Sequence, residues 1–158
     1  LAVGMKTAAE FEAYLHQHVP LSRAMSVSVR EYHGQSLQLA APLAPNHNDK
    51  GTAFAGSISG LASLAGWGLM MLWSDRLGPC QAAIARAEIR YSRPLRGDFS
   101  ARAYLPATDV LDAFLVDFAE RGRGKLPVRI EVGDAQGAGV VQEAVYAVWR
   151  LPVDPATI

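Results

Sequence analysis

The strongest constraint on this chain is a long segment without charge. Residues 51–73 contain no Asp, Glu, Lys or Arg, although charged residues make up 19% of the chain. The segment is rich in Gly, Ala and Ser and follows a polar run, residues 45–50. A helix here would present unpaired N–H groups and partial positive charge at its start. The sequence therefore predicts a long apolar helix, from near Gly56 to just before Gly78, with polar groups at its first turn.

Two environments suit such a helix, a membrane and a protein core. Roughly 20 apolar residues span a bilayer, and Gly56 and Gly60 form a GxxxG pattern that packs helices in membranes. The flanking positive charge is sparse, however, and four hydroxyl residues shorten the apolar part: Thr52, Ser57, Ser59 and Ser63. A membrane location would also leave the strands of the chain without cover. We therefore expect a core helix and no membrane span.

The rest of the chain alternates in a way typical of strands. Apolar and polar residues alternate over 25–30, 36–41, 83–91, 99–105, 126–132 and 141–149. Turns are expected at His33-Gly34 and over 134–139, and a basic loop over 121–125. Helices are predicted over 7–19, where Thr7 and Glu10 form a capping box and Pro20 ends the run, and over 108–120.

These elements predict an α+β fold in one domain, residues 1–158. Clear alternation favours antiparallel strands with one covered face, and the apolar helix is the main element able to cover it. We therefore expect an antiparallel sheet of about six strands wrapped around a long central helix. Ala83, Ala85 and Ala87 are expected to face that helix, because small residues allow close approach.

Composition narrows the function classes. Lys plus Arg and Asp plus Glu are 15 each, so the chain has no general attraction for nucleic acid. The single cysteine, Cys80, cannot form an internal disulfide, and residues 1–10 do not resemble a leader; both suit the cytoplasm. No metal site is expected, because His16 and His18 lie on different faces of the first helix.

The segment Leu43–Ser57, together with Leu64-Ala-Gly-Trp-Gly68, resembles the hotdog-fold acyl-thioester enzymes. The nearest resemblance is to the thioesterase family that also forms the C-terminal domain of YiiD-type acetyltransferases. It covers nearly the whole chain in element order. It implies an antiparallel sheet wrapped around a central helix. It also implies hydrolysis of the thioester bond of an acyl-CoA or of an acyl group on a carrier protein, at active sites between the subunits of a homodimer or tetramer. Coenzyme A would enter only as part of the substrate, with no separate cofactor.

The motif also resembles the phenylacetate-type thioesterase pattern, in which Asn-x-x-Gly-x-x-His-Gly-Gly precedes an Asp on the helix. Asn48, Gly51 and Gly56 match its Asn, first Gly and last Gly. Phe54 replaces the His, and Ser63 replaces the helix carboxylate. Hydroxybenzoyl-type thioesterases carry their carboxylate in the loop instead, at the position of Asn48. The resemblance thus implies the fold, while both usual carboxylate positions are neutral.

The catalytic candidates are Asn48, Asp49 and Ser63, and each has a structural alternative. Asn48 would orient water or the thioester carbonyl, or else shape a turn. Asp49, the one carboxylate of the motif, would be the general base or a loop or helix cap. Ser63 would face the pocket or bond to the backbone one turn back. Thr52 is expected to be a cap.

Further residues are candidates for binding the substrate. Backbone N–H groups near Ala55, Gly56 and Ser57 would stabilise an oxyanion, and Gly56 would let the carbonyl approach. The remaining binding candidates are Asn46, Gly51, Phe54 and Arg93. Arg93, Arg96 and the 121–125 segment would hold carrier phosphates or form a solvated rim. Alternatives to hydrolysis are non-hydrolytic binding of acyl thioesters and a dehydratase or hydratase on the same fold.

Overall fold

The fold begins with two short helices. The computed structural model describes residues 7–152. Helix α1, Ala8–His18, starts at the predicted capping box: Glu10 N–H donates to Thr7 Oγ1, and Thr7 N–H donates to the Glu10 carboxylate. Pro20 ends this run as predicted, but it also occupies the first position of a second helix, α2, Pro20–Ala24. Proline is favoured there because its fixed φ suits a helix start and its missing N–H would have no partner. The strand expected from Met25 therefore begins only at Ser28.

Six antiparallel strands form one sheet, in the order β1-β2-β4-β5-β6-β3. They are β1 Ser28–Tyr32, β2 Ser36–Ala41, β3 Cys80–Tyr91, β4 Phe99–Tyr104, β5 Arg123–Asp134 and β6 Gly137–Arg150. The long pairing of β5 with β6 leaves only two residues between them, 135 and 136, so the predicted turn over 134–139 is shorter than expected. The strands β1 and β3 form the two edges of the sheet.

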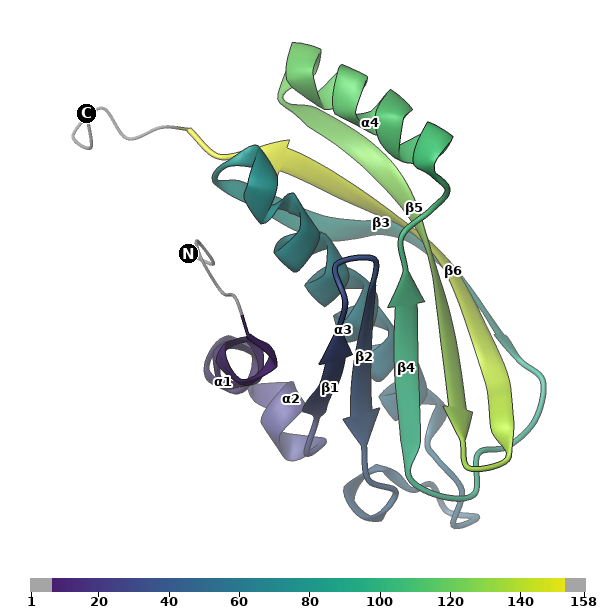
Figure 1. The fold of residues 1–158 in the computed structure, drawn as a ribbon. Coiled ribbons are helices and arrows are strands. Elements are labelled where there is room, and N and C mark those ends of the chain that lie inside the picture. The colour runs from purple at the N-terminus through teal and green to yellow at the C-terminus, as the bar shows by residue number, and fades with distance from the viewer. Residues whose placement is uncertain (1–6, 153–158) are drawn as a thin grey trace.

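The predicted central helix is present and the sheet curves around it (Figure 1). Helix α3, Ala55–Ser74, continues as the 3-10 turn η2, Asp75–Leu77. By length and composition this 23-residue segment would be able to cross a membrane. In the fold it packs on the inner face of the sheet, with Leu61, Ala65 and Leu69 fully buried. The α+β hotdog arrangement expected from the sequence is confirmed.

The expectation that Ala83, Ala85 and Ala87 all pack closely against α3 is wrong. All three are exposed, and Ala82 is the buried alanine of β3. A bulge shifts the β3–β6 register between Ile84 and Arg86, so the alternation in this strand changes face partway along it. As an edge strand that α3 covers only in part, β3 leaves most of its side chains in solvent.

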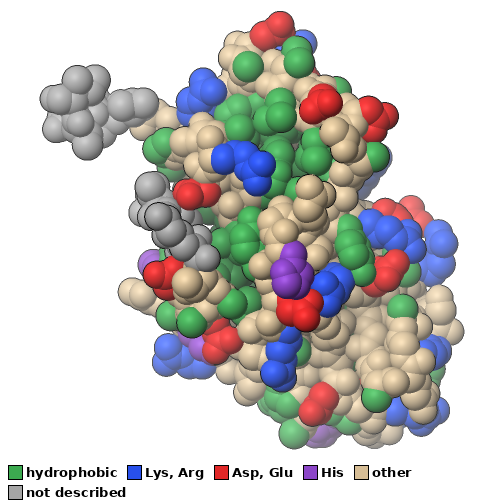
Figure 2. Space-filling model, in the orientation of Figure 1, with side chains coloured by type: hydrophobic (Ala, Val, Ile, Leu, Met, Phe, Trp, Pro, Cys, Tyr) green, Lys and Arg blue, Asp and Glu red, His purple; other side chains and the backbone are tan. Residues whose placement is uncertain are grey.

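The predicted basic loop over 121–125 is mostly strand. Strand β5 begins at Arg123, which lies opposite Trp149 of β6. The preceding helix, α4 Thr108–Arg121, agrees with the prediction and ends at Gly122 in the left-handed conformation (φ 66°). Phe114 and Phe118 of α4 are buried and cover the upper ends of β5 and β6. Figure 2 shows hydrophobic side chains exposed between α4 and the C-terminal end of α3, so this cover is incomplete.

Candidate functional site

A tight polar loop leads into the first turn of α3. The Asn48 carboxamide organises it: Oδ1 accepts the N–H groups of Lys50 (2.9 Å) and Thr52 (3.1 Å), and Nδ2 donates to Thr52 Oγ1 (2.9 Å). Gly51 adopts φ +72°, a conformation that side chains rarely tolerate. Phe54 N–H donates to the carbonyl of Asn46 (2.7 Å), which fixes the chain where it enters α3.

The start of α3 has no side-chain cap. Phe54 occupies the cap position with extended backbone angles and accepts the Ile58 N–H through its carbonyl (3.0 Å). The N–H groups of Ala55, Gly56 and Ser57 precede that first helical bond and have no partner within the helix. Gly56 lies under the Phe54 ring, because a Cβ there would be 2.3 Å from Phe54 Cε1. The helix therefore presents unpaired donors and partial positive charge at this end.

A cavity of about 330 Å³ adjoins this helix start. Two elements face each other across it, the 48–58 segment and the end of β3. Its lining is Asn48, Thr52, Ala53, Ala55, Ile58, Tyr91, Ser92, Arg93 and Pro94. The Tyr91 hydroxyl donates to the carbonyl of Ala55 (3.2 Å), which joins the strand end to the first turn of the helix. The lining combines hydroxyl, amide and apolar groups and includes no carboxylate.

Arg93 forms the outer wall of this cavity through an ion pair. Its guanidinium contacts the Asp134 carboxylate (2.7 Å), whose side chain is 3% exposed, and it also donates to the carbonyl of Gly137. Asp134 accepts the N–H groups of Arg96 and Gln136 as well. The Arg93 hydrogen bonds and these backbone donors hold the pKa of the Asp134 carboxyl well below its usual range. The cation of Arg93 is thus already neutralised within the fold.

A family comparison identifies this arrangement. The family described as "Putative thioesterase (yiiD_Cterm)" matches residues 8–150, which include every helix and strand named above.

The chain belongs to this thioesterase family.

Solved structures support the same fold. A protein of unknown function from Chlorobaculum tepidum is 27% identical, with a TM-score of 0.84, and the match covers 91% of this chain and 94% of that one. A "putative thioesterase" from Shewanella oneidensis is 25% identical, with a TM-score of 0.78 and coverage of 92% and 97%. A thioesterase from Haemophilus influenzae shares the fold at 13% identity, with a TM-score of 0.78 and coverage of 97% of both chains.

The structure separates the three catalytic candidates. Asn48 lies in the cavity, but its carboxamide bonds within the loop, as the turn interpretation requires. Asp49 lies outside the cavity lining: its side chain is 79% exposed and pairs with Lys50 Nζ (2.9 Å). Ser63 lines a different cavity, two turns further along α3. The structure does not bring these three side chains together.

The binding candidates divide in a similar way. Ala55 and Arg93 line the cavity, whereas Gly51 shapes the loop and Phe54 covers the start of the helix. Asn46 is 2% exposed and donates to the carbonyls of Met25 (2.9 Å) and Pro42 (2.8 Å). It ties the loop to the segment before β1. Gly56 and Ser57 belong to the open first turn but are not part of the cavity lining.

Sequence reasoning missed Tyr91 and Ser92 as site residues. The alternation over 83–91 places Tyr91 only on a strand face, whereas its contact with Ala55 joins residues 36 positions apart in the chain. A local signal does exist, because Tyr91-Ser92-Arg93-Pro94 ends an alternating strand at a proline. The signal does not reveal which element lies opposite.

A second cavity, of about 280 Å³, surrounds Ser63 and is largely apolar. Leu21, Gly60, Leu64, Trp67, Ile84 and Tyr146 contribute to its lining. The Tyr146 hydroxyl donates to the carbonyl of Ser63 (2.9 Å) and burial raises the Tyr146 pKa. Ser63 is seven residues after Gly56, or about 10 Å along the helix axis. This distance and the apolar lining favour a packing or acyl-chain environment over a place beside Asn48.

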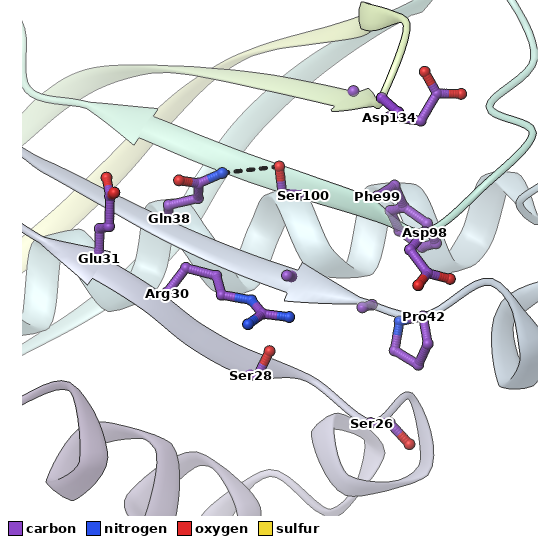
Figure 3. A pocket seen from close by; sticks show the side chains of 14 residues that line it. Ser26, Ser28, Arg30, Glu31, Gln38, Pro42, Asp98, Phe99, Ser100 and Asp134 are labelled. Atoms are coloured by element: carbon purple, nitrogen blue, oxygen red, sulfur yellow. Dashed lines mark hydrogen bonds between the residues drawn. The ribbon is translucent and has the colours of Figure 1, made fainter.

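A third hollow, of about 720 Å³, lies at the outer face of β1, β2 and β4 (Figure 3). Gln38 Nε2 donates to Ser100 Oγ there (2.9 Å), and Arg30 reaches into the hollow near Ser28. Glu31, Asp98 and Asp134 also line it, so the hollow carries charges of both signs. None of the residues predicted for the site lines it, and its mixed charges favour no ligand class.

Proposed function

We propose that this protein hydrolyses acyl thioesters of coenzyme A or of an acyl-carrier protein at the start of α3. The observation that carries the proposal is the uncapped first turn of α3, whose Ala55 opens into the 330 Å³ cavity. Backbone N–H groups aimed at a thioester oxygen stabilise the negative charge that develops when water attacks. Membership of a thioesterase family supports this reaction class.

In this proposal the cavity positions the reactants. The Ala55 N–H donates to the thioester oxygen, and the Tyr91 hydroxyl, beside Ala55, orients the bound group or the attacking water. Asn48 holds the loop in the shape that leaves the helix start open. Hydrolysis then depends on preorganised donors more than on a strong base within this subunit, because the cavity lining includes no carboxylate or imidazole.

The same observation favours a second candidate, a protein that binds acyl thioesters without cleaving them. The two functions separate in one experiment: pure protein is incubated with acyl-CoAs of short, medium and aromatic acyl groups, and free thiol release is followed. Hydrolysis predicts release with at least one member of the panel. Saturable binding of a non-hydrolysable acyl-CoA analogue with no thiol release would instead identify a binding protein.

We further propose that the protein works as a homodimer paired through β3. The other edge of the sheet is covered, because Val29 N–H of β1 donates to Glu12 of α1 (2.8 Å). On β3, Ile84 is 43% exposed and adjoins the apolar cavity around Ser63. An open strand edge beside an apolar surface suits a second copy of the chain. Light scattering tests this: Ile84→Lys should convert a dimer to a monomer, and a monomeric parent protein would refute the pairing.

A further inference from the structure

A basic hollow lies far from the proposed reaction site, at the opposite end of α3. Its volume is about 820 Å³. Its walls carry four cations, Arg121, Arg123, Lys125 and Arg150, against a single carboxylate, that of Asp117. Small residues open the space between them: Gly122, Gly124 and Ala147. In a chain with no net charge, this concentration of positive charge in one concave place favours an anionic ligand.

Two of these cations are held in place by contacts that leave their charge available. Arg150 stacks over the Phe118 ring, with 5.1 Å between Cζ and the ring centroid. Arg121 pairs with Asp117 (3.5 Å), and both side chains are exposed to solvent. Such exposed pairs contribute little to stability. Within residues 7–152, Arg123 and Lys125 form no ion pair. The hollow therefore carries positive charge that the fold has not neutralised, unlike Arg93.

An aromatic ring completes the hollow. Trp149 lies directly opposite Arg123 across the β5–β6 pair, and Lys125 lies opposite Ala147, one position further along the same face. The Trp149 indole thus lines the same hollow as Arg123 and Lys125, with the small side chain of Ala147 between them. Stacking on an aromatic ring is a sequence-independent way to bind a base, and arginine suits phosphate because its planar group forms paired hydrogen bonds.

We propose that this hollow binds a phosphorylated nucleotide, with the base against Trp149 and the phosphates held by Arg123, Lys125 and Arg150. Two sources offer this chemistry: the nucleotide end of a CoA thioester, or a free nucleotide. If the nucleotide belongs to a CoA thioester, the hollow is part of the substrate site. That inference rests on the proposed function and on the proposed dimer.

The geometry of β3 explains how a CoA thioester would reach the hollow. Within one subunit the 20-residue helix α3 separates the hollow from the reaction site by about 30 Å. Along β3, however, Tyr91 marks the site end, and Cys80, which pairs with Arg150, marks the hollow end. Antiparallel pairing of two β3 strands would place the hollow end of one subunit beside the site end of the other. Neighbouring strands are about 4.8 Å apart, so two to three strand spacings, roughly 10–14 Å, would separate Tyr91 from the basic strands β6 and β5 of the other subunit.

The first experiment measures binding and does not depend on catalysis. Adenosine 3′,5′-bisphosphate is titrated into the full chain by calorimetry at low salt, against the double variant Arg123→Gln/Lys125→Gln. We expect saturable binding by the parent protein and at least a tenfold weaker affinity in the variant. Arg129→Gln is the matched control, because Arg129 lies on the same strand but pairs with Glu131 and Glu143. No binding by the parent, or equal weakening by Arg129→Gln, would overturn the proposal.

The second experiment identifies the source. Hydrolysis of an acyl-CoA is compared with hydrolysis of the same acyl group on pantetheine, which has no nucleotide. If the nucleotide belongs to CoA, the double variant raises KM for acyl-CoA about tenfold and leaves the acyl-pantetheine kinetics unchanged. Unchanged kinetics with both substrates, alongside weakened bisphosphate binding, assigns the hollow to a free nucleotide. Absence of all thioester hydrolysis would refute the proposed function but leave the binding result to stand alone.

Discussion

The two ends of α3 use the same small residues for opposite purposes. Towards the C-terminal half, glycine allows contact: a Cβ at Gly66 would lie 2.4 Å from the Tyr146 hydroxyl, and one at Gly68 would lie 2.6 Å from the Phe11 ring. At the N-terminal end, Ala55 lines a cavity, and Gly56 is covered by the ring of one exposed side chain, Phe54. The C-terminal half of the helix packs closely against its neighbours, whereas the first turn is open.

This difference shows where stability and function are separable. Substitutions at the packed end should change the free energy of unfolding, because close-packed interiors respond to single methyl groups. Substitutions at the open end should change activity with little effect on folding. Each prediction below challenges that division, from the largest expected effect to the smallest.

The largest effect is expected from Ala55→Pro. Proline is favoured at the first position of a helix, and Phe54 before it already has the extended backbone that precedes proline (ψ 132°). The substitution therefore removes one N–H donor while the helix is kept. If that N–H stabilises the oxyanion, kcat should fall about 10²- to 10³-fold, with the thermal midpoint unchanged or raised. Ala55→Ser keeps the donor and serves as control. Full activity in Ala55→Pro would remove Ala55 from the mechanism.

A pair of glycine substitutions tests the packed end. Gly66→Ala should destabilise the protein by about 1–3 kcal/mol, since the new methyl group overlaps Tyr146 in a filled core. Gly60→Ala meets only the Met25 side chain, at 3.7 Å, and should be neutral or stabilise by up to about 1 kcal/mol through helix propensity. Urea unfolding of both variants gives the comparison. Equal effects would show that packing does not distinguish these positions.

The same division explains what the sequence predicts well. The helix and strands follow from periodicity, because residues 51–73 without charge have to be buried and alternating strands have to cover them. Side-chain direction was harder to predict. The bulge between Ile84 and Arg86 changes which side chains of β3 share a face, and nothing in the local pattern of β3 marks it. The positions of the Asn48 and Asp49 side chains could not be predicted, because they depend on which hydrogen bonds close the loop. The place of Tyr91 in the cavity depends on a contact between residues 36 positions apart.

The open end is held by charge as well as by packing, and this predicts sensitivity to acid. Because the folded pKa of Asp134 is depressed, its ion pair with Arg93 stabilises the fold above the unfolded carboxyl pKa, about 3.9. This stability is lost as pH falls below that value towards the folded pKa. Asp134→Asn should be less stable than the parent at pH 7, and the difference should narrow as pH falls from about 5 to 2. Denaturant unfolding over this range measures it; a constant difference would contradict the assignment.

The smallest effect is expected from Asp49→Ala, although Asp49 is the one carboxylate in the loop motif. Its side chain is exposed, pairs with Lys50 in solvent and lies outside the cavity lining. Exposed pairs of this kind contribute about 0–1 kcal/mol, so we expect unchanged stability and less than a twofold change in kcat/KM. Asn48→Ala is the informative companion, because it removes three hydrogen bonds of the same loop and should lower activity more. If Asp49→Ala alone lowered kcat/KM more than tenfold, the loop would have to rearrange to deliver this carboxylate as a general base. The open end of α3 would then include a loop that moves during the reaction.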